Sequence, residues 1–370
     1  MRRFNLVPGA PVLRLSQLRG RAPLRPPTGF WFSFERYALI HYLEFVSSRR
    51  DRPVKTVLCP DYMCHEVIQS LRDHGFGVEY YPLESGFRID PGRIEERIDA
   101  LGGAPAALIV VDFYGRMVRN LAEIASLCED KGVHLIEDCA HLPYPFPGPE
   151  REAPCEARFY TFRKVYGVPY GSTAALKDGQ EGFNRFVEEK VERRPDGSAS
   201  GVAKWVLREL GKKLVIESGL PYRREYRDLS QDPLKPYNFS HPWVERMLPE
   251  DEALRSVERR RANCRAYAEM ATLFEGWAEP LDFDLERDVP YQLLLLLREG
   301  LSPLELIEFF LANGVSAVRG LALHPEVLSG LPGGHPYRRQ VALPLHQDVS
   351  SDDIGYVRDM VRRFKKRKRI

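Results

Sequence analysis

Short apolar segments alternate with amphipathic segments of helical length through the N-terminal part of the chain. The apolar segments are expected to form strands at 54–60, 78–83, 107–115 and 133–141. The segments with helical spacing of apolar positions are expected to form helices at 36–46, 65–75 and 121–132. Gly75 and Gly132 close the last two helices, at a position that glycine favours. This alternation predicts an α/β fold built from βαβ units around a mostly parallel sheet.

The predicted strands are apolar without inside–outside alternation, which indicates that helices cover both faces of the sheet. In such sheets, ligands bind beyond the carboxyl ends of the strands. The polar residues that directly follow 107–111 and 133–136 are therefore the first places to look for chemistry.

Beyond the predicted sheet the pattern changes twice. Residues 180–250 are charged and rich in Pro and Tyr, with few clear elements, and we expect this excursion to wrap a partner subunit. A long helical stretch at 253–274 then leads into a smaller α+β unit that ends with a strand at 340–345. The Pro- and Arg-rich residues before position 32 are expected to form an arm. The predicted organisation is an arm (1–31), a large domain (32–250) and a small C-terminal domain (251–370).

Composition and charge exclude several classes of protein. Hydrophobic residues make up 44% and charged residues 29% of the 370, as in ordinary globular proteins. The net charge of +2 lacks the basic excess of a nucleic-acid binder. Positive charge gathers only near the C-terminus, at 362–369. We expect this run to be a frayed, solvated tail, with contact to anionic lipid or a polyanion as the alternative.

The cysteine pattern favours the cytoplasm. None of the six cysteines forms a CxxC pair, and several lie in apolar segments, so reduced thiols are expected. The N-terminus shows no apolar run typical of a signal peptide. The longest aliphatic run, 293–297, is far too short to span a membrane.

Asp138, in LIEDCAH, is the first candidate for chemistry. A carboxylate at the end of a buried strand is costly unless it has a cationic partner. A protonated pyridine ring, as in pyridoxal 5′-phosphate (PLP), is such a partner. His141, three residues later, could pack on that ring or bond its oxygen side. Taken alone, Asp138 is more often an ordinary turn or capping residue.

Lys164, in FYTFRKVYGVPYGSTAAL, is the second candidate. It lies between two β-prone apolar segments, where lysine is normally depleted. A poorly solvated amine there suits Schiff-base chemistry. Thr161 offers a hydroxyl to a phosphate. An isolated lysine at a strand edge is usually an exposed cation, and Lys177 in LKDG is an example of that ordinary kind.

The motifs occur together in the order of a known family. IEDCAH and YTFRK are accompanied by ERYAL, LCPDYMCHEVI, YNFS, ERRRANCRAY, VPYQL, LANGV and ALPLH. Over roughly residues 30–360 the chain resembles the DegT/DnrJ/EryC1/StrS family of PLP-dependent sugar aminotransferases. The resemblance implies a fold-type-I large domain, a small C-terminal domain and a homodimer with shared active sites. It also implies transfer of an amino group from an amino acid, such as glutamate, to a keto sugar.

The family's functional residues match individual positions of this chain. The resemblance implies that Lys164 forms the Schiff base, that Asp138 pairs with the pyridine nitrogen, and that His141 lies beside the cofactor. It also implies that Thr161 contacts the phosphate. Asn238 matches an asparagine that reaches the phosphate of a neighbouring subunit.

Several features depart from the family pattern, among them the glycine cluster after the lysine, which is thinned to YGSTAAL. Glu35 and Arg36 stand where a Gly-Thr or Gly-Ser pair normally opens a phosphate-binding helix, and Glu35 would repel a phosphate. Cys64 replaces a ring-stacking aromatic, which leaves Tyr62 or His65 as substitutes. The lysine also follows Phe162 by two residues rather than the usual four.

Two functions remain open at the level of sequence. The first is transamination, and the presence of Lys164 argues against the family's dehydratases, which lack this lysine. The second is a non-catalytic or weakly active protein that keeps the fold for binding or assembly, which the departures at residues 34–36 favour.

Overall fold

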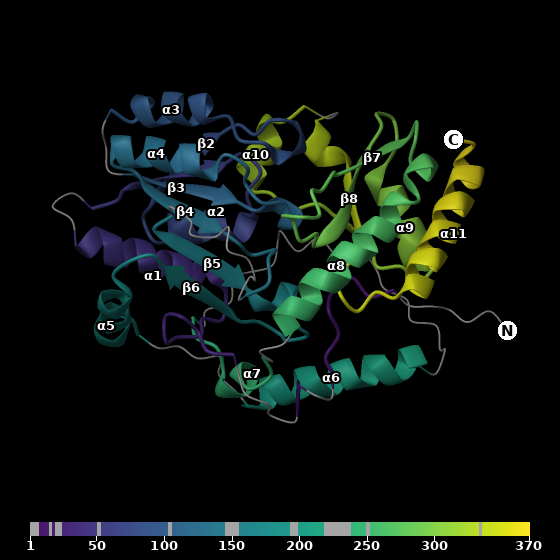
Figure 1. Cartoon of the computed structure of the whole chain (residues 1–370), viewed down its shortest axis with the longest axis horizontal. Helices are drawn as coiled ribbons and strands as arrows, with labels where there is room; N and C mark the ends of the chain where they lie inside the picture. Colours follow the sequence, from purple (N-terminus) through teal and green to yellow (C-terminus); the bar gives the residue numbers. More distant parts are fainter. Residues whose placement is uncertain are drawn as a thin grey trace.

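The computed structural model describes residues 7–14, 17–18, 24–49, 53–102, 106–144, 155–192, 199–217, 238–248, 252–332 and 335–370. Within these ranges the chain forms two β-sheets with helices around them, and the C-terminus lies on the side of the smaller sheet (Figure 1). The predicted domain boundary at residue 250 falls outside the described residues and stays a prediction.

The larger sheet has six strands in the order β2-β1-β3-β4-β5-β6. Its strands are β1 (Thr56–Pro60), β2 (Gly77–Tyr81), β3 (Ala106–Val111), β4 (His134–Asp138), β5 (Ala157–Thr161) and β6 (Ser172–Leu176). All neighbours pair in parallel except β5 and β6, which are antiparallel. The predicted mostly parallel sheet is therefore confirmed.

Helices cover both faces of this sheet, as the uniformly apolar strands predict. The helices are α1 (Glu35–Ser48), α2 (His65–Asp73), α3 (Pro91–Ala100), α4 (Leu121–Lys131) and α5 (Gln180–Lys190). Val57 and Ile136 face a core shared with α1, α2 and α5, whereas Leu58 and Leu135 face a core shared with α3 and α4. The left-handed conformation at Gly132 ends α4, as predicted.

The smaller sheet is antiparallel, in the order β7-β8-β10-β9. Its strands are β7 (Ala278–Pro280), β8 (Gln292–Leu297), β9 (Val318–Arg319) and β10 (Gln340–Pro344). The helices beside it are α8 (Glu252–Ala268), α9 (Pro303–Ala312), α10 (Pro325–Gly330) and α11 (Ser351–Lys368). Its core takes in α8, α9 and α11, and Val7 of the N-terminal segment pairs with Val315 beside it. The described part of the arm thus packs on its own chain.

Two predictions about irregular segments are wrong. The region from 180 contains α5, α6 (Ala199–Glu217) and the short α7 (Pro242–Glu245), although the pattern predicts few elements there. The basic C-terminal run is not frayed: it forms the last turns of α11, which begins with a capping box at Ser350 and Asp353. Lys368 pairs with Glu305 of α9 at 2.5 Å.

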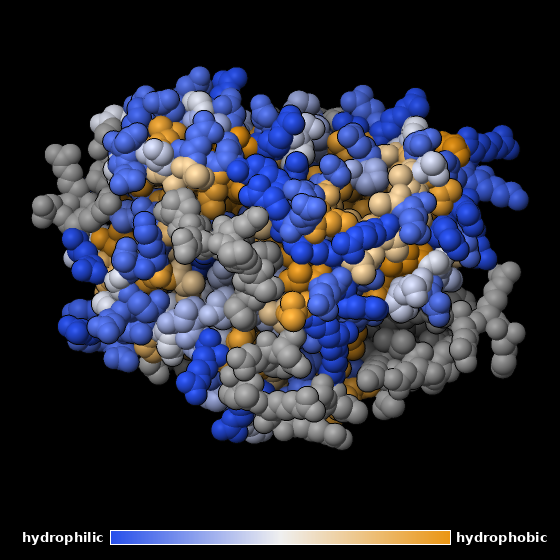
Figure 2. Space-filling model, in the orientation of Figure 1, coloured by the Kyte–Doolittle hydropathy of each residue, from blue (hydrophilic) through white to orange (hydrophobic). Residues whose placement is uncertain are grey.

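The surface is mostly hydrophilic at its rim. On the face shown, apolar residues gather in the middle, near α8 (Figure 2). None of the described helices combines the length and the apolar character that crossing a membrane requires.

Candidate active site

The candidate site lies at the carboxyl edge of the larger sheet. The register aligns Val111 of β3 with Asp138 of β4, and Asp138 with Phe159 of β5. The strand β5 ends at Thr161, and the chain turns through a short 3-10 helix, Phe162–Lys164, before it returns as β6. Parallel pairing thus places Asp138 near the turn that carries Lys164.

Asp138 faces the side of the sheet that α1 covers. Because side chains alternate along a strand, it points to the same face as Ile136, which packs in the core under α1. Its side chain is buried, and its Oδ1 accepts a hydrogen bond of 2.9 Å from the backbone N–H of Ala140. The sequence prediction of a buried carboxylate at this edge agrees with this placement.

Glu35, the first residue of α1, contacts Asp138 directly. The two side chains share a hydrogen bond, and the Thr161 hydroxyl donates to Glu35 Oε2 at 2.5 Å. Burial, and then the charge of Asp138, raise the pKa of Glu35 well above its ordinary value, while the Lys164 charge opposes the rise.

Lys164 is half-buried and its charge acts on this cluster. The Lys164 ammonium is, after burial, the largest influence that lowers the pKa of His141. It also opposes the rise that burial causes in the pKa of Cys64. The turn that carries it is fixed by backbone hydrogen bonds from Val165 and Tyr166 to the carbonyl of Phe162. The structure therefore brings Glu35, Asp138, His141, Thr161 and Lys164 together.

His141 has one ring nitrogen with a partner and one without. The backbone N–H of Tyr114 donates to Nδ1 at 3.0 Å, so Nε2 carries the ring proton. Nε2 is buried and has no hydrogen-bond partner among the described residues. The ring stacks on Tyr291, with centroids 4.8 Å apart, and on Tyr114 at 5.5 Å. Burial lowers the pKa of His141 well below its usual value, so the ring is neutral.

Arg260 of α8 connects the segment that carries His141 to the turn that carries Lys164. The sequence analysis assigns no role to this residue. Its guanidinium is fully buried and donates to the backbone carbonyls of Lys164 at 2.9 Å and His141 at 3.3 Å. Gln347 accepts a third hydrogen bond from it at 3.2 Å. Burial lowers the pKa of Arg260 to about 10, so it stays charged at neutral pH. The triple arginine in ERRRANCRAY was the available signal, but three adjacent arginines cannot be told apart by pattern.

Arg36 turns away from this cluster. It is buried, and it forms a salt bridge of 2.7 Å with Glu66 of α2. Its guanidinium also lies over the rings of Phe34 and Tyr37. Its role toward a phosphate stays a prediction.

Tyr62 lies in a polar network between the two sheets. Its hydroxyl bonds Gln340 and the Tyr114 hydroxyl, and it accepts from the backbone N–H of Leu321 at 2.8 Å. A Cβ at Gly320 would lie 2.3 Å from this hydroxyl, so only glycine fits there. His65, the other aromatic substitute, stacks on His324 at 5.2 Å. No described contact joins either ring to Asp138 or Lys164, and ring stacking by them stays a prediction.

Asn238 lies at a separate place, against α1. Its side-chain amide donates to the carbonyl of Glu192 at 3.0 Å and lies 3.5 Å from His41 Nε2. It lines a cavity of about 260 Å³ together with Tyr37 and His41. No described contact joins Asn238 to the lysine cluster within one chain, and its role toward a neighbouring subunit stays a prediction.

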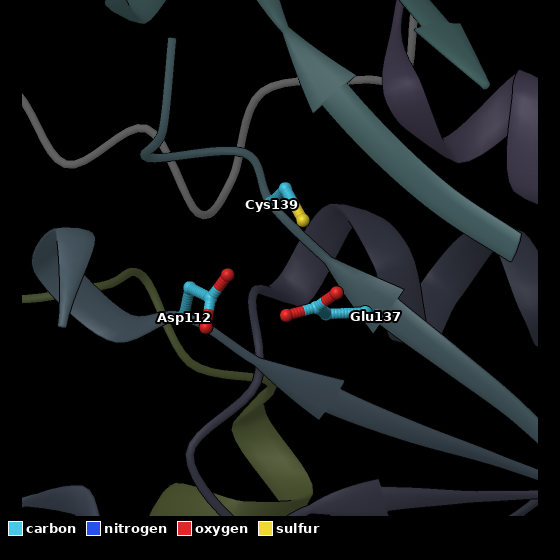
Figure 3. Close-up of side chains that lie close together, drawn as sticks. All are labelled: Asp112, Glu137 and Cys139. Carbon is cyan, nitrogen blue, oxygen red and sulfur yellow. The ribbon is translucent and has the colours of Figure 1, made fainter. Parts of the chain in front are cut away.

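A second acidic cluster lies at the ends of β3 and β4. Asp112, Glu137 and Cys139 point toward one another, with donor atoms within 4.8 Å (Figure 3). Arg158 Nε donates to Glu137 at 2.7 Å, and the N–H of Val118 donates to Asp112 at 3.0 Å. These donors account for the buried carboxylates, and we assign no metal to the cluster.

Comparison with protein families gives a match over part of the chain. Residues 64–142 match the DegT/DnrJ/EryC1/StrS aminotransferase family, which confirms the resemblance over that stretch. This stretch carries Asp138 and His141 but ends before Lys164. No curated protein matches the sequence.

Solved structures share the fold over nearly the whole chain. Helicobacter pylori PseC, an aminotransferase involved in the biosynthesis of pseudoaminic acid, is 11% identical with a TM-score of 0.67, over 97% of this chain and 98% of PseC. The sugar aminotransferase CalS13 from Micromonospora echinospora is 13% identical with a TM-score of 0.62, over 97% of this chain and 100% of its own. An E. coli GDP-4-keto-6-deoxy-D-mannose-3-dehydratase with bound hydrated PLP is 14% identical with a TM-score of 0.63, over 94% and 89%. The fold is therefore that of the fold-type-I PLP enzymes.

Proposed function

We propose that this chain is a PLP-dependent aminotransferase that moves an amino group from an amino-acid donor, glutamate, to a keto sugar or a similar carbonyl acceptor. The observation that carries the proposal is the meeting of an amine, a carboxylate and an unpartnered imidazole N–H at one sheet edge. These groups are Lys164, Asp138 and His141. The family match at 64–142 and the shared fold support the same reading.

The residues present fit the ring of PLP. His141 Nε2 is a buried donor without a partner among the described residues, and an oxygen on a bound ring would satisfy it. Asp138 would hold the ring nitrogen, and the Lys164 amine would bond the cofactor's aldehyde carbon. When bound, PLP supplies an electron sink for charge that develops on the substrate carbon.

Each residue then has a chemical task. The Asp138 carboxylate keeps a proton on the ring nitrogen, because a nearby negative charge favours the protonated form. The Lys164 Nζ would hold a proton and deliver it to a carbon atom of the bound substrate.

The lysine separates this reaction from dehydration. A dehydratase has a similar fold at a similar TM-score, so the fold alone does not choose between the two. A half-buried lysine whose charge reaches Asp138's hydrogen-bond partner Glu35 favours transamination.

The test is to trap the cofactor on its lysine. Purified protein incubated with PLP and reduced with borohydride should carry a stable adduct on a single peptide that contains Lys164. Lys164→Ala should lose the adduct and stay folded, because a smaller side chain leaves room rather than a clash. Lys177→Ala is the matched control, and it should keep the adduct. An adduct that persists in Lys164→Ala would contradict the assignment.

The reaction class needs its own assay. Glutamate and a panel of keto acceptors, including nucleotide-linked keto sugars, should give 2-oxoglutarate in proportion to aminated product. Loss of water from the acceptor without amination would instead indicate a dehydratase.

A second candidate function rests on one observation. The Glu35 carboxyl occupies the hydroxyl of Thr161 and bonds Asp138, the two groups that a cofactor needs. A protein that keeps the fold for binding or assembly, with little or no PLP, would tolerate that arrangement. The borohydride experiment separates this candidate from the first.

A further inference from the structure

The phosphate end of the site differs from its ring end. His141 Nε2 has no hydrogen-bond partner among the described residues, whereas Thr161 already gives its hydroxyl to Glu35. The same Glu35 carboxyl bonds Asp138. One side chain therefore occupies both the predicted phosphate donor and the predicted ring-nitrogen partner.

We propose that Glu35 is a built-in competitor of the cofactor phosphate, so that this site binds PLP only by displacing Glu35 and discriminates weakly between PLP and pyridoxal, which lacks the phosphate. The inference rests on the proposed function, because it concerns the same site. It concerns the affinity for the cofactor and not the chemistry that follows.

Glu35 lies at the end of α1 where a phosphate would bind, and this position favours its competition with the phosphate. It opens α1, and its carboxyl lies at the positive end of the helix dipole. No side chain caps this helix end, since Phe34 stands at the N-cap. A phosphate that approached the first turn would meet a carboxyl already placed there, and any charge on that carboxyl would repel it.

The nearby cations do not offset the competition between Glu35 and a phosphate. Arg36, the adjacent cation, is held by Glu66 at 2.7 Å, on α2. Lys164 is the remaining cation that acts on Glu35, and the proposed function uses its amine for the aldehyde carbon. For Thr161 to serve a phosphate, its hydrogen bond to Glu35 must break.

The experiment compares two probes on matched variants. PLP and pyridoxal are titrated by absorbance into the wild-type protein, Glu35→Gln and Glu35→Ser, with thermal melting to check that each variant folds. The glutamine keeps the shape and removes the charge, whereas the serine removes the group and supplies a hydroxyl. Glu96→Gln is the control: it removes one negative charge from an exposed position on α3, on the opposite face of the sheet.

The expected result is a change in the ratio of the two affinities. Glu35→Ser should bind PLP about tenfold more tightly than wild type, the gain expected from freeing the Thr161 hydroxyl for a charged group. Glu35→Gln should gain less, because its amide oxygen can still accept the hydrogen bond from Thr161. Pyridoxal affinity should change much less, and Glu96→Gln should match wild type for both probes.

The other outcomes are distinct. If the wild type and the Glu35 variants bind PLP equally and all give the Lys164 adduct, Glu35 is no competitor and the proposed function stands. If the affinities for PLP and pyridoxal rise equally in the variants, Glu35 competes only with the ring of the cofactor and the inference is overturned. If no variant binds either probe, both the inference and the proposed function fail.

Discussion

At the residue scale, the main feature of the site is the contact between the carboxyl groups of Glu35 and Asp138. Asp138 lies where a strand ends under a helix, and Glu35 comes from the helix above it. Burial and the charge of Asp138 raise the pKa of Glu35 well above its ordinary value, which favours the protonated form of Glu35. A pyridine ring nitrogen would take the place of Glu35 as the partner of Asp138. A carboxylate at this position, unlike an amide, can stabilise a protonated ring nitrogen through its negative charge.

Asp138→Asn tests the role of that charge. An amide cannot hold a ring nitrogen protonated as a carboxylate does, so turnover should fall by about 100-fold or more. The PLP content should stay near normal, because Lys164 still forms the covalent bond. Single-turnover kinetics together with cofactor quantification measures both quantities.

The matched control is Asp90→Asn. Asp90 caps α3 through a hydrogen bond to the N–H of Gly92, and asparagine caps a helix equally well. Its turnover should equal that of wild type. Unchanged turnover in Asp138→Asn would remove the pyridine partner from the mechanism.

At the scale of elements, α8 acts as a brace between the two sheets. It packs in the core of the smaller sheet, and its Arg260 holds the carbonyls of His141 and Lys164 beside the larger one. The planar guanidinium can hold both carbonyls at fixed positions, which a lysine ammonium cannot. The site geometry therefore depends on an element that contributes no group to the reaction.

Arg260→Lys should misplace the site while the protein still folds. The lysine retains the buried charge but lacks the planar set of N–H donors that holds both carbonyls. A shift of about 1 Å in catalytic groups can cost about 100-fold in rate. We expect kcat to fall while the KM for the donor changes little. Arg261→Lys is the control, since Arg261 donates to the carbonyls of Glu286 and Asp288, away from the site. Equal effects of the two substitutions on kcat would contradict the positioning role.

The elements also show what a sequence pattern can and cannot predict. The strands β1 to β4 were predicted within a few residues, because a buried parallel strand is apolar on both faces. The helices α5 and α6 were missed, since their charged and aromatic residues hide a weak helical period. The structured C-terminal turns were missed because their charges indicate solvent, whereas α11 is anchored through apolar positions such as Val361 and Phe364.

Within the site, the pattern located residues but not their contacts. Lys164 and Asp138 were identified because each is unusual at its place in a buried segment. The position of α1 over the sheet determines two of these contacts. One is the salt bridge from Arg36 to Glu66, and the other is the set of hydrogen bonds that join Glu35 to Thr161 and Asp138. Such contacts between distant segments are set by tertiary packing, which a local period does not encode.

At the scale of the whole molecule, the separation of Asn238 from Lys164 predicts a site shared between two subunits. Asn238 lines a cavity beside α1, apart from the lysine cluster. We expect its amide to reach the phosphate of a neighbour. In a dimer with C2 symmetry, two identical sites then lie across one interface.

Mixing two inactive variants tests this arrangement. Asn238→Ala and Lys164→Ala chains should each be inactive, and a heterodimer should contain one site with both defects and one with neither. Random exchange of subunits places half of the chains in heterodimers. Each heterodimer has two sites, of which one is intact. About a quarter of the wild-type activity should therefore return on mixing, which a coupled assay measures. A protein that sediments as a monomer while it binds PLP fully, or a mixture that stays inactive although mass spectrometry shows exchange, would rule out the shared site.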